Sequence, residues 1–296
     1  MKDFSGKIAV VTGGGSGIGR ALVRQLTAEG CSVALCDISE GDMEETIRLA
    51  SPDAPQGVKI IPFVADVGQE DRVNAFRDHV LAETGTDHIH LLFNNAGISG
   101  GGSFLNAPRS QWERTFAVCW YGVYYNCRAF LPLLIKADEG HVVNVSSVNG
   151  FWASLGPDTP HTAYSAAKFA VKGFTEALLT DLAINAPHVK ASVVMPGHIG
   201  TSIGLNTMRE FADADGIPGG PQIDADEARA RMEAFRDSGL RPEDAAKIIL
   251  DGVKSDSWRI LVGPDAIALD AAVRAHPEQA YGPEMAAIIM AGNEVR

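Results

Sequence analysis

Short apolar runs alternate along this chain with longer segments in which apolar residues recur every three or four positions. The apolar runs predict strands near residues 7–12, 32–37, 59–64, 89–94, 140–146, 189–195 and 258–262. The periodic segments predict helices, notably over residues 17–29, 70–84, 109–136, 163–185 and 242–254. We therefore predict an α/β fold in which a doubly wound parallel sheet of about seven strands carries helices on both faces. Ligands of such sheets bind beyond the carboxyl ends of the strands.

A glycine-rich turn follows the first predicted strand directly and opens the first predicted helix. It reads Thr12-Gly13-Gly14-Gly15-Ser16-Gly17-Ile18-Gly19. Gly13 permits a tight turn, Gly17 lets the backbone approach a pyrophosphate, and Gly19 lets the helix pack close to the strand. The start of the helix then offers free N–H groups and the positive end of its dipole to phosphates. A glycine turn without a ligand is the alternative, and the strand–turn–helix context disfavours it.

A phenol and an ammonium lie four residues apart in Tyr164-Ser-Ala-Ala-Lys168, inside a predicted helix. Side chains at this spacing share a helix face and can point at one spot. We expect the charge of Lys168 to lower the pKa of Tyr164, because a nearby cation favours the phenolate. A phenol tuned in this way can pass a proton to or from a hydroxyl or a carbonyl. The spacing alone is weak evidence, since it also occurs on solvated helices.

The two motifs together resemble those of the classical short-chain dehydrogenase/reductase family, in which T-G-x-x-x-G-x-G precedes Y-x-x-x-K. Further matches are Asp66-Val67 after the third predicted strand and Asn94-Asn95-Ala96-Gly97 after the fourth. Ser147-Val148-Asn149-Gly150 ends the fifth strand, and Pro196-Gly197-His198-Ile199-Gly200-Thr201 follows the sixth. The resemblance extends from about Lys7 to Thr201 and continues more weakly beyond.

This resemblance implies a Rossmann-type fold and hydride transfer between a nicotinamide cofactor and a secondary alcohol or ketone. It assigns catalysis to Ser147, Tyr164 and Lys168, with Ser147 binding the substrate oxygen and Tyr164 transferring the proton. Lys168 would also bind the nicotinamide ribose. The cofactor contacts that it implies are Gly13, Gly15, Ser16, Gly17, Ile18, Gly19, Asp37, Ile38, Asp66, Val67, Asn94, Ala96, Gly97, Tyr164, Lys168, Pro196, Gly197, Ile199 and Thr201.

The end of the second predicted strand bears on the choice of cofactor. Asp37 stands where an acidic side chain can accept hydrogen bonds from the adenosine ribose and repel a 2′-phosphate. Relatives that prefer NADP tend to carry a basic residue at the position of Ile38 or of Ser16. We therefore predict NAD as the cofactor. The alternative, ranked second, is that Asp37 only caps the following loop.

One position departs from the family pattern. Between Trp112 and Gly122 the family has an asparagine that holds a water in the proton relay, and here the residue is Cys119. A thiol is a weak donor and a weak acceptor, so it cannot replace an amide directly. Three interpretations stay open: a rearranged water chain, slow catalysis, or a dinucleotide-binding regulatory or scaffold protein without useful catalysis. We favour a working enzyme, and we regard Cys119 as an ordinary buried thiol rather than a redox sensor.

Two segments bear on the substrate. The loop from Phe151 to His161 is longer than usual in the family, and Phe151, Trp152 and Leu155 are candidates for an apolar pocket. A long excursion over about 202–240 corresponds to the family's substrate lid. It is divided by Ile217-Pro218-Gly219-Gly220-Pro221 and ends in a charged helix from Asp224 to Asp237. A solvated insertion or an oligomer contact is the alternative for it. We expect a bulky, largely uncharged substrate. His161 and His198 are treated as structural, because a lone histidine is more often so.

Composition and charge limit which partners and which compartment the protein can have. The 296 residues fit a single domain, and a net charge of -12 argues against nucleic-acid or anionic-membrane partners. No apolar run is long enough to span a bilayer, and the start of the chain leaves no room for a signal peptide. The cysteines lack the spacing of a metal site or a disulfide framework, so we expect no metal and a reducing cytoplasm. A homodimer or homotetramer is expected from the family, through the aromatic-rich helix 109–136, helix 163–185 and the apolar end from Met285 to Met290.

Overall fold

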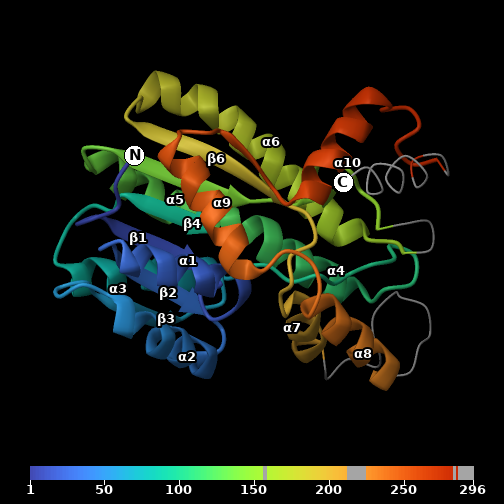
Figure 1. The fold of residues 1–296 in the computed structure, drawn as a ribbon, viewed down its shortest axis with the longest axis horizontal. Coiled ribbons are helices and arrows are strands. Elements are labelled where there is room, and N and C mark those ends of the chain that lie inside the picture. The colour runs from blue at the N-terminus through green and yellow to red at the C-terminus, as the bar shows by residue number, and fades with distance from the viewer. Residues whose placement is uncertain (156–158, 212–224, 283–284, 286–296) are drawn as a thin grey trace.

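The computed structural model describes residues 1–155, 159–211, 225–282 and 285, and its centre is a parallel sheet (Figure 1). The strands follow the order β3-β2-β1-β4-β5-β6-β7, so the chain winds outward from β1 in both directions. Their bounds are β1 Ile8–Thr12, β2 Ser32–Asp37, β3 Ile60–Val64, β4 Leu91–Asn94, β5 Gly140–Val145, β6 Val189–Pro196 and β7 Arg259–Val262. The predicted fold class and the seven predicted strands are confirmed, each to within two residues.

Helices connect the strands and cover both faces of the sheet. They are α1 Gly17–Ala28, α2 Glu40–Ala50, α3 Glu70–Thr84, α4 Arg109–Phe116, α5 Gly122–Lys136, α6 Thr162–Asn185, α7 Ile203–Glu210, α8 Ala225–Arg236, α9 Pro242–Lys254 and α10 Pro264–Ala275. The charged helix predicted from Asp224 to Asp237 corresponds to α8. Three of the helices, α2, α7 and α10, lie outside the helix ranges given above. The glycine- and proline-rich break predicted at 217–221 lies outside the described residues.

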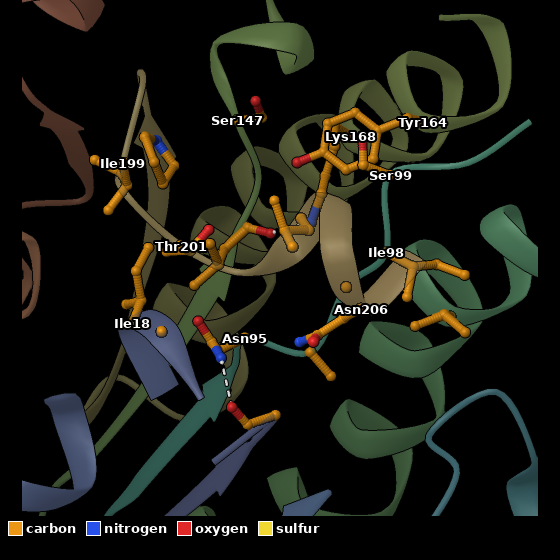
Figure 2. A pocket seen from close by; sticks show the side chains of 18 of the residues that line it. Ile18, Asn95, Ile98, Ser99, Ser147, Tyr164, Lys168, Ile199, Thr201 and Asn206 are labelled. Atoms are coloured by element: carbon orange, nitrogen blue, oxygen red, sulfur yellow. Dashed lines mark hydrogen bonds between the residues drawn. The ribbon is translucent and has the colours of Figure 1, made fainter. Parts of the chain in front are cut away.

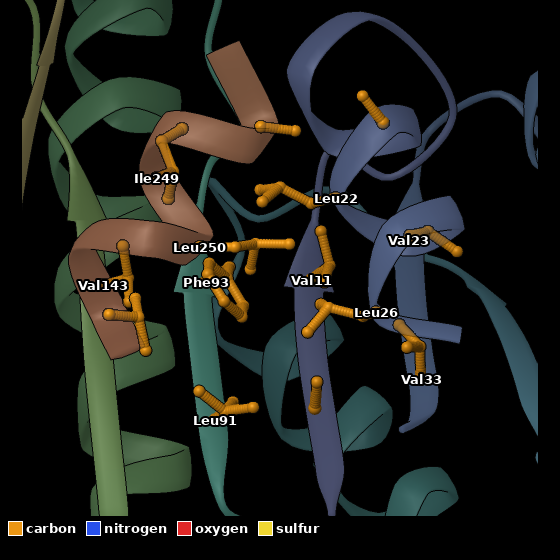
Figure 3. Close-up of a cluster of buried hydrophobic side chains, with 14 of the residues drawn as sticks. Val11, Leu22, Val23, Leu26, Val33, Leu91, Phe93, Val143, Ile249 and Leu250 are labelled. Atoms are coloured by element: carbon orange, nitrogen blue, oxygen red, sulfur yellow. The ribbon is translucent and has the colours of Figure 1, made fainter. Parts of the chain in front are cut away.

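The inner strands β1, β2, β4, β5 and β6 bury side chains on both faces, which explains their continuous apolar runs. Val11, Phe93 and Val143 point to the face covered by α1 and α9, where Leu22, Leu26, Ile249 and Leu250 pack on them (Figure 3). Their chain neighbours Val10, Leu92 and Val142 point to the opposite face, where Phe76 of α3 and Phe130 of α5 complete a second core. The period of two along each strand thus divides one apolar run between two layers.

The predicted helix 109–136 is interrupted in the structure. A π-helical segment, Ala117–Tyr121, separates α4 from α5 and contains Cys119. Such widened turns are rare and are often found at functional sites. On the α4 side of this segment, Arg114 pairs with Glu210, which joins α4 to α7.

The described residues also bear on metals and membranes. Within them, no group of three or more His, Cys, Asp or Glu side chains is arranged to hold a metal ion. In that same part of the chain, no helix combines the length and apolar character needed to cross a bilayer.

Candidate active site

A cavity of about 920 Å³ opens at the carboxyl edge of the sheet, where residues at the strand ends and residues of α7, α8 and α10 line it. Its volume is within the range of about 300–1,000 Å³ that is usual for ligand sites. One end is bordered by the glycine turn and β2, and the other by Ser147, Tyr164 and Lys168 (Figure 2). Most of the predicted cofactor residues line it: Gly13, Ser16, Gly17, Ile18, Asp37, Ile38, Asp66, Val67, Ala96, Gly97, Tyr164, Lys168, Pro196, Gly197, Ile199 and Thr201.

Three predicted cofactor residues are not in the cavity wall and have structural surroundings instead. Gly15 donates its backbone N–H to Asp37 Oδ2 over 3.0 Å. Gly19 packs so closely on the turn that a Cβ atom there would lie 2.0 Å from the carbonyl oxygen of Gly13. Asn94 is buried within the sheet and donates to Asn144 Oδ1 over 2.7 Å.

Asn95, which the sequence analysis did not single out, fastens the glycine turn to β4. Its side-chain amide donates to the carbonyl oxygens of Thr12 and Gly13 at 3.0 and 3.3 Å. Thr12 Oγ1 in return accepts from the backbone N–H groups of Asn95 and Ala96, both at 3.0 Å. The repeated asparagine in Asn94-Asn95 was the available signal: the first faces the sheet and the second faces the turn.

The glycine turn has the features that a pyrophosphate needs. Gly13 and Gly17 have φ of 65° and 50°, in the left-handed region that glycine adopts without strain. Ser16 precedes α1 but does not cap it with its side chain, so the first N–H groups of the helix remain available. A Cβ atom on Gly17 would lie 3.0 Å from Cγ2 of Thr201, which brings the 196–201 loop against the turn. The residues present therefore fit a dinucleotide.

Two carboxylates follow β2 and β3 at the same end of the cavity. Asp37 accepts from the N–H groups of Gly15 and Ser39, while burial raises its pKa above the ordinary value. It therefore caps the following loop and also lines the cavity. Asp66 pairs with Arg114 of α4 at 2.8 Å. Burial opposes ionisation of Asp66, but hydrogen bonds from Gln69, Arg114 and Gly68 together hold its pKa below the usual range.

Ser147, Tyr164 and Lys168 converge at the other end of the cavity (Figure 2). Ser147 stands after β5, and its hydroxyl accepts from the backbone N–H of Asn149 over 3.1 Å. Lys168 lies one turn after Tyr164 on α6, with Nζ 5.4 Å from the centre of the phenol ring, and donates to the carbonyl oxygen of Val145 over 2.9 Å. The geometry thus brings the three residues together as the motif spacing predicts.

The predicted depression of the Tyr164 pKa by Lys168 needs correction. Burial raises the pKa of the phenol above its ordinary value, and the neighbouring Ser147 hydroxyl offsets only part of that effect. Burial likewise lowers the pKa of Lys168. Both shifts have one cause, because an enclosed site disfavours each charged form. The lysine alone does not outweigh the desolvation of the phenol.

Cys119 lies close to these groups but faces the backbone. It is fully buried, and its thiol donates to the carbonyl oxygen of Ile98 over 3.2 Å. A Cβ atom placed on Gly97 would lie 3.7 Å from Cys119 Sγ and 3.6 Å from Lys168 Nζ, so the thiol and the ammonium flank the same glycine. The departure from the family pattern therefore lies beside Lys168, where a relay would begin.

Loops and late segments of the chain form the wall near Tyr164. Its lining residues are mostly apolar, and include Val118, Val148, Trp152, Leu155, Phe235, Ala268 and Leu269. His161 also lines the cavity, and its ring centre lies 4.7 Å from that of Tyr164; burial lowers its pKa to about 4. His198 lines the cavity as well, and its ring stacks on Phe235 of α8 at 4.2 Å.

The end of the described chain is fastened to this wall. The indole N–H of Trp152 donates to the carbonyl oxygen of Ala280, and the Tyr281 hydroxyl accepts from the N–H of Ala153. Phe151, which the sequence analysis offered for the pocket, is not among the lining residues. Most of the apolar end predicted to pack on a neighbouring subunit, 286–290, lies outside the described residues, and Met285 itself is buried.

Comparisons with known proteins agree with this architecture. The family model described as short chain dehydrogenase matches residues 7–210. A protein of Mycobacterium tuberculosis named as oxidoreductase SadH is 38% identical over 277 residues, which cover 93% of this chain and 92% of that protein. Human epidermal retinol dehydrogenase 2 is 32% identical over 203 residues, or 68% of this chain and 63% of that protein.

A solved structure extends the likeness to three dimensions. A short-chain dehydrogenase/reductase from Burkholderia phymatum, crystallised in complex with NAD, superposes with a TM-score of 0.82 at 29% identity, covering 96% of this chain and 98% of that one. The glycine turn and the Tyr164–Lys168 helix face both lie within the residues that the family model matches. The chain belongs to the short-chain dehydrogenase family, and it is an oxidoreductase of that family.

Proposed function

We propose that the protein is an NAD-dependent oxidoreductase that interconverts a bulky, largely apolar secondary alcohol and the corresponding ketone. The observation that carries the proposal is the joint placement of Ser147, Tyr164 and Lys168 at one end of a cavity whose other end is the glycine turn. In support, Asp37 stands at the ribose end with Ile38 beside it rather than a basic residue. The complex of the Burkholderia phymatum relative with NAD points the same way.

The residues of this chain would divide the work as follows. The glycine turn and the 196–201 loop would hold the pyrophosphate and the nicotinamide, and Asp37 the adenosine ribose. When bound, NAD supplies the acceptor or donor of hydride. Ser147 would hydrogen-bond the substrate oxygen, and the phenol of Tyr164 would give it a proton during reduction or remove one during oxidation.

The raised pKa of Tyr164 bears on the two directions differently. A neutral phenol is the form that donates a proton to a carbonyl oxygen, and burial favours it. Oxidation requires the phenolate, and Lys168, 5.4 Å from the ring centre, is the cationic side chain placed to stabilise it. Lys168 would thus matter most when the enzyme removes a proton from an alcohol.

The remaining parts of the proposal concern the substrate, assembly and compartment. The apolar wall supports a bulky substrate, and α7 and α8 would form the lid of a single-domain enzyme. Tyr121 and Tyr124 of the π-helical segment and α5 are about two-fifths exposed, in support of a homodimer or homotetramer through this surface. All four cysteines are free and buried, which suits the cytoplasm.

A substrate panel tests this proposal. Purified protein is mixed with NAD and secondary alcohols ranging from small aliphatic to aryl and steroid-sized, and NADH formation is followed by absorbance. We expect turnover, with the highest kcat/KM for bulky apolar alcohols, because most residues of the wall near Tyr164 are apolar. Preference for small, highly charged alcohols would contradict the substrate class. Binding of NADH without turnover of any alcohol or matching ketone would favour the alternative of a non-catalytic dinucleotide-binding protein.

Cys119→Asn is expected to stay folded and active, with turnover equal to or above that of the natural protein. The residue flanks Gly97 opposite Lys168, so an amide there can bind a water that a weakly bonding thiol holds poorly. Steady-state kinetics with the best alcohol of the panel measure the effect. The control is Cys119→Ala, which places no polar group at the same position. Cys127→Asn is unsuitable as a control, because Cys127 is buried among Asn94 and Asn144. A folded but inactive Cys119→Asn would refute the proposed equivalence of this position to the family's asparagine.

A further inference from the structure

Two arginines lie near the end of the cavity where Asp37 stands, and they differ in what their guanidinium groups can do. Arg20 of α1 is committed to neutral oxygen acceptors. Its Nε donates to the carbonyl oxygen of Gly15 and to the hydroxyl of Thr46, both at 3.0 Å, and its Nη2 to the carbonyl oxygens of Gly15 and Asp42. Arg20 does not line the cavity. It therefore braces the glycine turn against α2 and is not free to meet a ligand.

Arg209 is the other arginine, and it lines the cavity. It belongs to α7, and its side chain is 68% exposed. Asn206, on the same helix, donates to Ser16 Oγ over 3.3 Å, and Glu210 pairs with Arg114 at 2.6 Å. These contacts hold α7 across the cavity beside the glycine turn. A guanidinium in this position could bind a phosphate group strongly, because arginine is well suited to bidentate phosphate recognition.

Asp42 is the carboxylate that faces Arg209. Its Oδ2 lies 3.9 Å from Nη1 of Arg209, and both residues line the cavity. Asp42 is held in the first turn of α2, where its N–H is capped by the hydroxyl of Ser39. The guanidinium of Arg209 thus faces a carboxylate of the protein itself within the cavity wall.

Asp42 also adds a second negative charge beside Asp37. A Cβ atom placed on Gly15 would lie 2.8 Å from Oδ2 of Asp37 and 3.0 Å from Cβ of Asp42, so the two acidic residues flank one point of the glycine turn. Burial is the main cause that raises the pKa of Asp37, and hydrogen bonds from the backbone lower it. The negative charge of Asp42 is a further cause that raises it. The negative charges of Asp37 and Asp42 therefore both act on the part of the cavity beside Gly15.

We propose that Asp42 is a second determinant of cofactor selectivity, which excludes a 2′-phosphate by its own charge and by occupying Arg209. The inference rests on the proposed function, since it explains how that site distinguishes NAD(H) from NADP(H). It implies that Asp37 alone does not determine the preference. Removing Asp37 leaves the carboxylate of Asp42 facing Arg209, whereas removing both carboxylates leaves the guanidinium of Arg209 without that partner in the cavity wall.

The test uses cofactor binding, so it does not depend on finding a substrate. Dissociation constants of NADH and NADPH are measured by fluorescence titration for the natural protein, Asp37→Ser, Asp42→Asn and the double variant. We expect Asp42→Asn to improve the NADPH-to-NADH affinity ratio about tenfold in either background, as one gained charged contact allows. Adding Arg209→Gln to the double variant should remove most of the gain that Asp42→Asn brings.

A matched control lies one turn further along the same helix. Glu45 pairs with Arg48 on the exposed side of α2 and does not line the cavity, so Glu45→Gln changes the net charge equally without touching the site. If Asp42→Asn improves NADPH binding no more than Glu45→Gln does, Asp42 is not a determinant of cofactor selectivity. The proposed binding of NAD would be unaffected by that result. If the gain in NADPH affinity survives Arg209→Gln, the proposed role of the Asp42–Arg209 pair is wrong. Repulsion between Asp42 and the 2′-phosphate then explains the effect. Failure of the natural protein to bind either dinucleotide would overturn the proposed function together with this inference.

Discussion

Tyr164→Phe is expected to lower turnover by roughly 10²–10⁴-fold, the usual contribution of a positioned proton-transfer group. The ring remains, so its packing against His161 and the approach of Lys168 are kept. The change removes only the hydroxyl that lines the cavity beside Ser147 and would exchange a proton with the substrate oxygen. We therefore expect NADH to bind as before while kcat falls. Single-turnover kinetics beside fluorescence titration of NADH separate the two quantities.

Tyr124→Phe provides the comparison, because Tyr124 is partly exposed on α5 and does not line the cavity. It should leave kcat within about twofold of the natural value, as expected of a surface change far from the reacting atoms. Turnover retained by Tyr164→Phe would show that another group transfers the proton. His161 would then be the first residue to examine, since its ring lies 4.7 Å from that of Tyr164 in the same cavity.

Gly19→Ala is expected to destabilise the fold by about 3 kcal/mol, the upper part of the usual range for overpacking. Its Cβ atom would lie 2.0 Å from the carbonyl oxygen of Gly13 and 2.7 Å from Nδ2 of Asn95. Neither atom can yield cheaply, because one is backbone and the other fastens the turn to β4. The turn must shift, so NADH affinity should fall as well. Urea denaturation followed by circular dichroism measures the stability.

Gly41→Ala is the matched change, in a helix where the added methyl group meets no atom within 4 Å. Its effect should stay below about 1 kcal/mol, with stabilisation the expected direction because alanine restricts the unfolded chain. Equal denaturation midpoints for Gly19→Ala and the natural protein would mean that the glycine turn relaxes freely. The close packing of α1 on the turn would then not be what requires glycine at this position.

The sheet was predictable because its signals are local. A strand buried on both faces needs a continuous apolar run, and Ile8–Val11 or Val142-Val143 provide it within a few residues. The ends of the strands followed from the glycine and polar residues after them. The placement of Ser147, Tyr164 and Lys168 at one spot followed from the parallel topology together with the four-residue spacing on α6.

What could not be predicted depends on contacts between distant segments. The contacts of Asn94 and Asn95 divide between the sheet and the turn, which requires knowing that β4 lies between β5 and β1. The short helix α7 is held by Ser16 and Arg114, far away in the chain. The pKa of Tyr164 depends on how completely the fold encloses it, and motif spacing carries no information on burial. Motif spacing therefore predicted where the candidate catalytic side chains lie, but it did not predict their pKa shifts.

The strand order has a consequence for how the chain reaches this structure. β1, the strand that carries the glycine turn, pairs with β2 at once but acquires its other neighbour only when β4 arrives, with Ala9 beside Leu91. Until then an apolar edge of β1 stays unpaired, and exposed edges of this kind invite association between chains. Long-range parallel pairing is also slow to form. During synthesis the nucleotide-binding half therefore depends on residues made long after it, and a fragment ending before β4 would expose the strand on which the site is built.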